Sequence, residues 1–230
     1  MKVVILQPSY IPWRGFFDQI NTADLFVFYD DVQYDKRGWR NRNRIKTSAG
    51  PIWLSIPVYN RGAQTEHIAI NTIKIVWDRP WNKEHWNSIK MAYSKAPYFS
   101  QYSGLVEEFY SGKPEMLADF TISTTISLAR TIGISHTRFL RSSEIEGVEG
   151  TKTDRLISIL KKVGATHYFS GPSARDYIET NKFEDAGIRL DYMEYDYPEY
   201  PQLYPPYDSQ VSILDTLFMM GPDTLKTFAK

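Results

Sequence analysis

Two uninterrupted apolar runs, Val3–Leu6 and Leu25–Tyr29, constrain the fold more than any other feature of the chain. Apolar runs of this length are typical of strands that are buried on both faces of a parallel sheet. Between them, Pro8 and Pro12 interrupt the backbone, and apolar residues then recur at helical spacing as far as Ile20. The order strand, turn, helix, strand predicts a βαβ unit with two parallel strands.

Hydrophobic patterns in the rest of the chain extend this unit into an α/β protein. Further strands are predicted at residues 137–140, 167–169 and 188–193. A small, partly antiparallel β region is predicted from residues 41–46, 52–58, 67–70 and 73–76. We expect one domain spanning residues 1–230, with a mainly parallel, Rossmann-like sheet in three layers and a helical insertion at about 82–132.

Composition excludes several classes of function. The 230 residues carry no net charge, which argues against a nucleic-acid-binding protein, because such proteins need a broadly basic surface. The absence of cysteine excludes a thiol nucleophile and thiolate metal sites. No apolar run is long enough to span a bilayer, and Met1-Lys2 leads straight into a core strand, so we expect a cytoplasmic protein without an integral membrane segment.

Polar residues follow both strands of the predicted βαβ unit. Gln7 and Tyr10 come after the first strand, and Asp30-Asp31 comes directly after the second. Because open α/β folds bind ligands at the carboxyl ends of parallel strands, we expect these residues to meet at one edge of the sheet. The two carboxylates could act as a base, bind a cation or accept protons from a sugar. Turn chemistry is the alternative, since Asp also favours loops.

Basic residues alternate along the next predicted strand. Arg40, Arg42, Arg44 and Lys46 would share one face of that strand, and Asn43 would lie on the other face. Guanidinium groups match phosphate and carboxylate in forked geometry, so the pattern favours an anion-binding surface. A solvated edge strand protected by charge is an equally good interpretation of this stretch alone.

Two further candidates lie outside the N-terminal region. His85 falls on an aromatic helix face, where a histidine is usually a packing residue but could also act as a general acid or base near neutral pH. Ser170-Gly171 follows the predicted strand at 167–169 and would join the same edge as Gln7 if that strand is parallel. A tight turn is the alternative for this pair.

Standard cofactor signatures are missing. The chain has no phosphate loop, no dinucleotide-binding glycine turn, no nucleophile elbow and no histidine pair at zinc-ligand spacing. The sequence therefore implies no metal or dinucleotide, and the cofactor, if there is one, stays unknown.

Several longer motifs together resemble the WbqC-like protein family. They are Gln7-Pro-x-Tyr10-x-Pro-Trp13-x-Gly15-Phe16-Phe17, Ala23-Asp24, Asp30-Asp31-Val32-Gln33-Tyr34, Trp39-x-Asn41-Arg42-Asn43-Arg44-Ile45-Lys46, Tyr168-x-Ser170-Gly171-Pro172 and Ser212-Ile213-Leu214-Asp215. Members are typically encoded among bacterial genes for O-antigen, lipopolysaccharide and related surface polysaccharides. The resemblance implies transfer of glycine, another amino acid or an acyl group onto an amino sugar, and it strengthens the case for His85.

Three functional hypotheses follow. The first is a transferase acting on a nucleotide sugar or another phosphorylated small molecule, with His85, Asp30 or Asp31 as the base. Its expected substrate-binding residues are Gln7, Tyr10, Trp13, Arg40, Arg42, Asn43, Arg44, Ser170 and Gly171. The second is a nucleotidylyltransferase or ligase, although Trp13-Arg14-Gly15 stands where the His-x-Gly-His signature of nucleotidylyltransferases would be. The third is a non-catalytic binding or scaffold protein of the same pathway.

Overall fold

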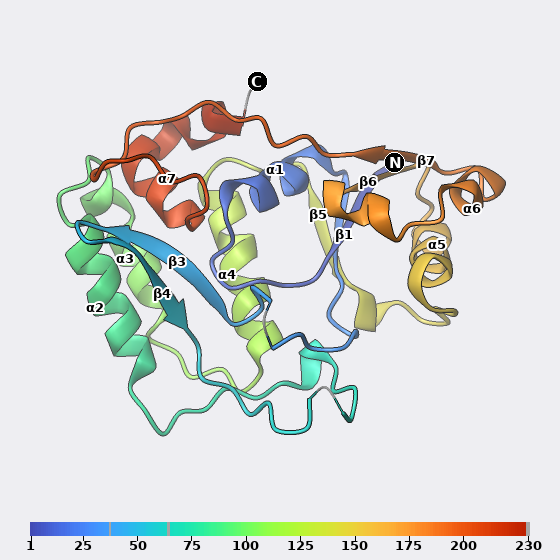
Figure 1. Ribbon diagram of the computed structural model, residues 1–230, viewed down its shortest axis with the longest axis horizontal. Helices are drawn as coiled ribbons and strands as arrows, with labels where there is room; N and C mark the ends of the chain where they lie inside the picture. Colours follow the sequence, from blue (N-terminus) through green and yellow to red (C-terminus); the bar gives the residue numbers. More distant parts are fainter. Residues whose placement is uncertain (37, 64, 229–230) are drawn as a thin grey trace.

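A central parallel sheet organises the fold. The structure is a computed structural model that describes residues 1–36, 38–63 and 65–228. Within these ranges, five strands pair in the order β5-β2-β1-β6-β7 (Figure 1). Their bounds are β1 Lys2–Leu6, β2 Leu25–Phe28, β5 Arg138–Arg141, β6 His167–Ser170 and β7 Arg189–Tyr192. Every pair is parallel, so the prediction of a mainly parallel α/β sheet is confirmed.

The strand order contains a topological switch point. From β1 the chain moves outward to β2 and then β5, and it returns to the other side of β1 at β6. In open α/β sheets, the crevice at such a reversal lies outside the carboxyl ends of the two central strands and is where ligands bind. Here those ends are Leu6 of β1 and Ser170 of β6.

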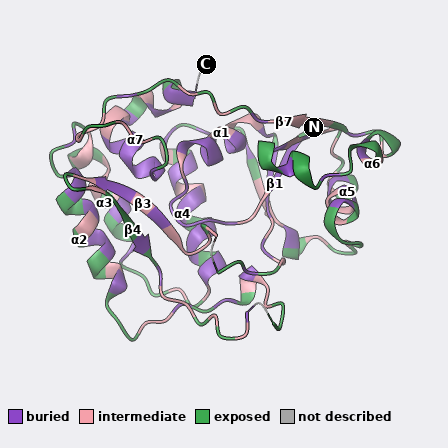
Figure 2. Ribbon diagram, viewed as in Figure 1, coloured by how far each residue is buried: buried purple, intermediate pink, exposed green. Residues whose placement is uncertain are grey.

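Helices cover both faces of the sheet. Helices α1 (Arg14–Thr22) and α4 (Leu117–Thr131) pack on the face that carries Val4 and Phe26. Helices α5 (Lys152–Lys162) and α6 (Thr180–Asp185) pack on the opposite face, which carries Val3 and Val27. Neighbouring strand residues point to opposite faces, so each strand contributes to two cores. Figure 2 shows this buried interior in purple.

In the residues described between β2 and β5, the connection holds the β hairpin and the helices α2 (Trp81–Tyr93), α3 (Phe99–Phe109) and α4. Strands β3 (Arg42–Thr47) and β4 (Gly50–Ser55) pair antiparallel, as predicted. Helices α2 and α3 follow, and α4 then returns the chain to the sheet. Arg130 of α4 lies over the ring of Phe139 in β5, 5.1 Å from its centroid. The last helix of the expected insertion is therefore the crossover helix of the sheet.

The prediction of two short strands at 67–70 and 73–76 is wrong. A 3-10 turn, η1 (Ile70–Thr72), and isolated bridges occupy this stretch. The backbone N–H of Ile70 bonds to Val32, whereas that of Ile75 bonds to Glu115, so neighbouring residues pair with different segments. The apolar pattern came from side chains that anchor an irregular segment to the core.

Short elements complete the chain. Two 3-10 turns, η2 (Ser142–Glu144) and η3 (Pro172–Asp176), follow β5 and β6. Helix α7 (Ile213–Met220) and the 3-10 helix η4 (Gly221–Phe228) come after a long segment that crosses from β7 toward β3 (Figure 1). In the part of the chain that the structure describes, no helix is both long and apolar enough to cross a membrane.

Candidate functional site

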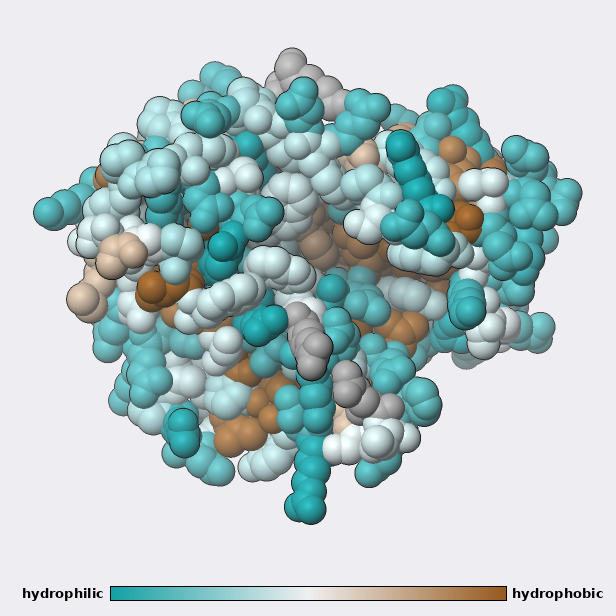
Figure 3. All heavy atoms as spheres, viewed as in Figure 1, coloured by the Kyte–Doolittle hydropathy of each residue, from teal (hydrophilic) through white to brown (hydrophobic). Residues whose placement is uncertain are grey.

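A cavity of about 1270 Å³ lies at the switch point. The carboxyl ends of β1 and β6 contribute Leu6, Gln7, Ser170 and Gly171 to its wall. On the face shown in Figure 3, hydrophobic side chains are visible at the bottom of a hollow in the surface. The cavity extends around the sheet edge, because residues of both α1 and α5 line it. The position agrees with the general rule for ligand sites in open α/β sheets.

Aromatic rings form the wall on the α1 side. The ring of Trp13 meets that of Tyr195 edge to face, with 5.0 Å between centroids. Gly15 makes room for this arrangement, since a Cβ atom there would lie 2.4 Å from the Trp13 ring. Phe16 and Gln19 continue the wall along α1.

Phenol groups dominate the wall on the α5 side. Tyr29, Tyr168 and Tyr177 line it together with Lys152 and Leu156. Burial raises the pKa of all three phenols above the ordinary value of 10.0. They are therefore protonated at neutral pH and can donate hydrogen bonds to a ligand.

Arg40 is held in the wall of the cavity by the turn after β1. Its Nη1 atom donates to the carbonyl oxygens of Gln7 (2.9 Å) and Pro8 (3.3 Å). Burial lowers the pKa of its guanidinium to about 10, and Asp35 and Tyr34 act in the opposite direction. The group therefore keeps its positive charge at neutral pH. Its Nε atom is buried and has no hydrogen-bond partner among the described residues.

The charges on the cavity wall have one sign. Among the described residues that line the cavity, Arg40 and Lys152 carry charge, and no Asp, Glu or His is present. Positive charge in a partly enclosed, low-dielectric site attracts anions strongly. The arrangement can bind a negatively charged ligand whose rings pack against the aromatic walls.

Six of the residues singled out from the sequence line this cavity: Gln7, Trp13, Arg40, Asn43, Ser170 and Gly171. The amide of Asn43 also shapes it, because its Nδ2 atom donates to the carbonyl oxygens of Tyr10 (3.1 Å) and Ile11 (2.8 Å). Ile11 has a positive φ of 34°, a conformation that is rare for a β-branched residue and needs such support. Asn43 therefore fixes the turn that follows β1.

Tyr10 and His85 do not line the cavity. The Tyr10 hydroxyl lies 2.9 Å from Nδ1 of His85 and 2.6 Å from the hydroxyl of Tyr110, in the helical side of the core. Burial lowers the pKa of His85 to about 4, partly offset by a backbone hydrogen bond with Ser55. The imidazole is therefore neutral at pH 7, and this geometry gives it a packing role. A catalytic role for His85 stays a prediction without support from the cavity.

The two aspartates join the ends of neighbouring strands and also lie outside the cavity lining. Asp30 is fully buried and accepts hydrogen bonds from the Ser143 amide (3.1 Å) and hydroxyl (2.9 Å), and from the Ser142 hydroxyl (3.2 Å). Asp31 pairs with Arg155 of α5 at 2.5 Å and accepts from the Ser142 hydroxyl at 2.6 Å. These contacts tie β2 to β5 and α5, so each carboxylate already has protein partners.

The three arginines of the basic stretch make different contacts within the protein. Arg40 precedes β3, so the alternation of a strand does not apply to it. Arg42 lies over the ring of Trp53 at 4.6 Å, and Arg44 donates to the Gln210 carbonyl at 2.8 Å. Neither Arg42 nor Arg44 lines the cavity, whereas Arg40 does. The cavity lining therefore supports an anion-binding role for Arg40, and such a role for Arg42 and Arg44 stays a prediction.

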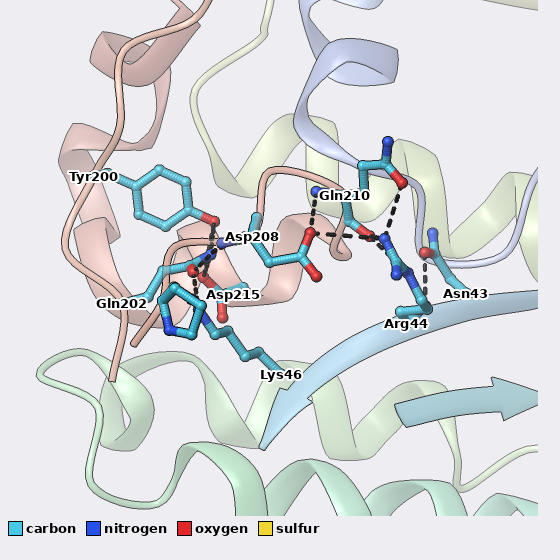
Figure 4. Close-up of polar contacts among 9 residues, drawn as sticks. Asn43, Arg44, Lys46, Tyr200, Gln202, Asp208, Gln210 and Asp215 are labelled. Atoms are coloured by element: carbon cyan, nitrogen blue, oxygen red, sulfur yellow. Dashed lines mark hydrogen bonds and ion pairs between the residues drawn. The ribbon is translucent and has the colours of Figure 1, made fainter. Parts of the chain in front are cut away.

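A buried polar network, missed by sequence reasoning, holds the C-terminal segment against β3 (Figure 4). Asp215 accepts hydrogen bonds from the hydroxyls of Tyr93 (3.0 Å) and Tyr200 (2.8 Å) and from Gln202 (2.9 Å). Lys46 donates to Gln202 at 2.6 Å and to the Pro206 carbonyl. Burial raises the pKa of Asp215. The motif Ser212-Ile213-Leu214-Asp215 was the sequence feature that could have indicated this network.

Arg14 anchors the same segment from the other side. It is 3% exposed and donates to the carbonyl oxygens of Pro198 (2.9 Å) and Thr227 (3.2 Å) and to the Tyr207 hydroxyl (2.7 Å). Its guanidinium also lies 4.8 Å from the ring centroid of Tyr197. These contacts bring Tyr195, two residues earlier, to the cavity wall. No local pattern in the sequence indicated this.

Metal-binding side chains are not clustered. No group of three or more His, Cys, Asp or Glu side chains that could hold a metal ion occurs among the described residues.

Comparisons with known proteins agree on one relationship. The model of the WbqC-like protein family matches residues 7–227. A Mycobacterium tuberculosis (strain ATCC 25618 / H37Rv) protein described as "Uncharacterized protein Rv1507c" is 40% identical over 230 residues, covering 98% of this chain and 97% of that protein. No solved structure matches the chain. The family match covers most of the cavity lining and the whole C-terminal network, and the chain therefore belongs to the WbqC-like protein family.

Proposed function

We propose that this protein is a transferase of bacterial surface-polysaccharide biosynthesis. It binds a nucleotide-linked sugar in the cavity between β1 and β6 and moves an amino acid or acyl group onto the sugar's amino group. The observation that carries the proposal is the charge of the wall: Arg40 and Lys152 are the charged residues among the described lining. A diphosphate supplies the matching negative charge.

Size and wall chemistry support the same ligand class. Small-molecule pockets usually measure about 300–1,000 Å³. The cavity of about 1270 Å³ is larger, so it can hold a ligand with several parts. Its aromatic rings can pack against a base or a sugar, and its amide and hydroxyl groups can bind sugar hydroxyls. Because nucleotide sugars are made in the cytoplasm, the proposal implies a cytoplasmic enzyme.

The proposed reaction joins an amine to an activated carbonyl. The amino nitrogen attacks the acyl carbon, an N–C bond forms, and the bond from that carbon to a phosphate or thiolate leaving group breaks. The nitrogen proton leaves with the departing group or passes to solvent. The described cavity wall holds no carboxylate or imidazole, so its contribution is positioning and charge stabilisation. Roles for His85, Asp30 and Asp31 are not part of this mechanism.

Exposed aromatic residues beside the cavity favour a second candidate, a non-catalytic binding protein. Trp39 and Trp53 are 41% and 47% exposed, and their ring centroids lie 5.1 Å apart. Trp53 and the 38% exposed Ile52 belong to β4, one of the two strands of the hairpin sheet. Exposed apolar groups on such a strand can bind another protein.

Titration calorimetry separates these candidates. The wild type is titrated with nucleotide sugars, free sugars, acyl-CoA and ATP at two salt concentrations. We expect a nucleotide sugar to bind with an affinity that falls as salt rises. Arg40→Met should weaken that binding by about tenfold or more, the scale of a charge-assisted hydrogen bond.

Arg189→Met is the matched control, because Arg189 begins β7 at the opposite edge of the sheet and its side chain is 71% exposed. It should leave the affinity unchanged. If no phosphate-bearing compound binds to the wild type, the second candidate takes precedence. Hydrolysis of ATP in the same assay would instead favour a ligase or nucleotidylyltransferase.

A further inference from the structure

Gln19 is a buried polar residue on the cavity wall with an unused hydrogen-bonding atom. It is 3% exposed, and it lines the cavity from helix α1. Its Oε1 atom is buried and has no hydrogen-bond partner among the described residues. Leaving a buried polar atom unpaired is costly, so such atoms are rare in folded proteins. An unpaired acceptor at the wall of a cavity is explained if a ligand supplies the missing donor.

The surroundings of Gln19 restrict what that ligand can be. Trp13, Phe16 and Gln19 are spaced three residues apart along the first turns of α1, so they lie on the same side of the helix and all line the cavity. Tyr195 closes this wall, with its ring 5.0 Å from that of Trp13. We call these four residues the amide lobe. It offers flat aromatic surfaces with a single amide among them.

We propose that the amide lobe is a nucleobase subsite, in which Gln19 accepts a hydrogen bond from an N–H group on the pairing edge of the base. This inference rests on the proposed function, because it places one part of the nucleotide-linked sugar. Proteins that bind isolated bases stack them on aromatic side chains and read the pairing edge by hydrogen bonds. A primary amide carries an acceptor and donors side by side, which is complementary to that edge.

A sugar fits the amide lobe less well than a base does. A hexose presents several hydroxyl groups that all need partners, and the polar groups of the amide lobe are the Gln19 amide, the Trp13 indole N–H and the Tyr195 hydroxyl. Hydroxyl and amide groups are more numerous elsewhere in the cavity, where Gln7, Ser170 and Ser173 line it. The sugar therefore belongs in that part, with the diphosphate at Arg40.

The test combines one substitution with one altered ligand. Calorimetry first identifies the nucleoside diphosphate that binds most tightly to the wild type. Its analogue, in which the N–H of the pairing edge is replaced by N–CH₃, is then titrated. We expect the wild type to bind the methylated analogue about tenfold or more less tightly. The Gln19→Met variant should bind the natural ligand more weakly than the wild type does, by a similar factor. It should bind the methylated analogue no more weakly than the natural ligand.

Two further measurements separate recognition from a structural role. Gln19→Met removes an unpaired buried atom, so the unliganded variant should melt no lower than the wild type. Gln101→Met is the matched control, since Gln101 is an exposed residue of helix α3, and it should leave both affinities unchanged. If Gln19→Met does not fold, Gln19→Glu replaces it, because the carboxylate keeps an acceptor and should keep the sensitivity to methylation.

The outcomes distinguish this inference from the proposed function. Equal binding of the natural ligand to wild type and Gln19→Met would overturn the base subsite, while nucleotide binding itself would stand. The base subsite would also be overturned, with nucleotide binding intact, if methylation of the ligand weakened its binding equally to wild type and Gln19→Met. If no nucleotide binds to the wild type, both the proposed function and this inference fail.

Discussion

The Arg40 guanidinium donates a hydrogen bond to the carbonyl oxygen of Gln7, 33 residues earlier in the chain, across 2.9 Å. This contact joins the basic segment to the carboxyl end of β1, where the switch point lies. It places one positive charge of the basic stretch in the cavity, and it makes the shape of the turn after β1 dependent on that charge.

Replacing Arg40 with lysine should therefore affect stability and binding together. The lysine ammonium ends one bond nearer the backbone than Nη1 of Arg40, so it cannot keep both contacts at their present lengths, and we expect the free energy of unfolding to fall by about 1–2 kcal/mol. Affinity for a nucleotide sugar should fall less than in Arg40→Met, because the charge remains. Urea denaturation and calorimetry measure the two effects. Unchanged stability would mean that the contact with Gln7 does not hold the turn.

Asp30→Asn should act mainly on stability. The carboxylate of Asp30 accepts two hydrogen bonds from Ser143 and shares the Ser142 hydroxyl with Asp31 in a fully buried position, and asparagine replaces a charge-assisted acceptor with a neutral one. We expect a loss of about 1–3 kcal/mol in the free energy of unfolding. Ligand affinity of the folded variant should not change. An inactive variant with unaltered melting temperature would instead support a catalytic Asp30.

His85 should make the protein sensitive to acid. Its pKa is lowered to about 4 in the folded state by burial, against an ordinary value of 6.5. The unfolded state therefore binds more protons between these two values, so this contribution to stability is complete above pH 6.5 and is lost as pH falls toward 4. At pH 5 the loss should be about 2 kcal/mol.

Urea denaturation of wild type and His85→Gln at pH 7 and pH 5 checks this expectation. Glutamine does not titrate, so the variant should lose less stability than the wild type over this interval. Equal losses in both proteins would show that other groups cause the acid sensitivity.

Lys46 and Asp215 should be energetically coupled through the network of Figure 4. Both are buried, and Gln202 contacts both side chains. Asp215→Ala leaves the buried donors of Tyr93, Tyr200 and Gln202 without their acceptor and removes the carboxylate near the buried Lys46 ammonium, so we expect it to cost about 3–5 kcal/mol. The double variant Lys46→Met/Asp215→Leu should cost less than the sum of the single changes. Additive costs in a denaturation cycle would rule out the coupling.

Gly15→Ala should disturb the cavity through Trp13. The added Cβ would lie 2.4 Å from the Trp13 ring, which must then move. We expect a loss of about 1–3 kcal/mol in stability and weaker ligand binding, measured by denaturation and calorimetry. Gly104→Ala is the control, since a Cβ atom there meets nothing within 4 Å on helix α3. It should stabilise the protein by about 0.5–1 kcal/mol. Undisturbed binding in Gly15→Ala would remove Trp13 from the site.

Much of the fold was predictable because it depends on local patterns. The apolar runs of β1 and β2 and the helical spacing between them dictate parallel strands, and the structure confirms this pairing. The same logic brought Gln7 and Ser170 to one cavity, since both follow parallel strands that turn out to be neighbours. The same reasoning gave a wrong prediction of strands at residues 67–76, because buried side chains can alternate along a segment that does not form a strand.

The sequence by itself determined the strands β1 and β2, their parallel direction and the edge where the cavity forms, because these follow from backbone geometry and hydrophobic periodicity. Only the tertiary structure decided which polar groups reach that cavity. His85 was drawn into the core beside Tyr10, and Arg42 and Arg44 turned to Trp53 and Gln210. Gln19 and Tyr195 were brought to the wall by packing between distant segments. Such contacts join side chains that are far apart in the sequence. The spacing of residues along a single helix or strand does not predict them.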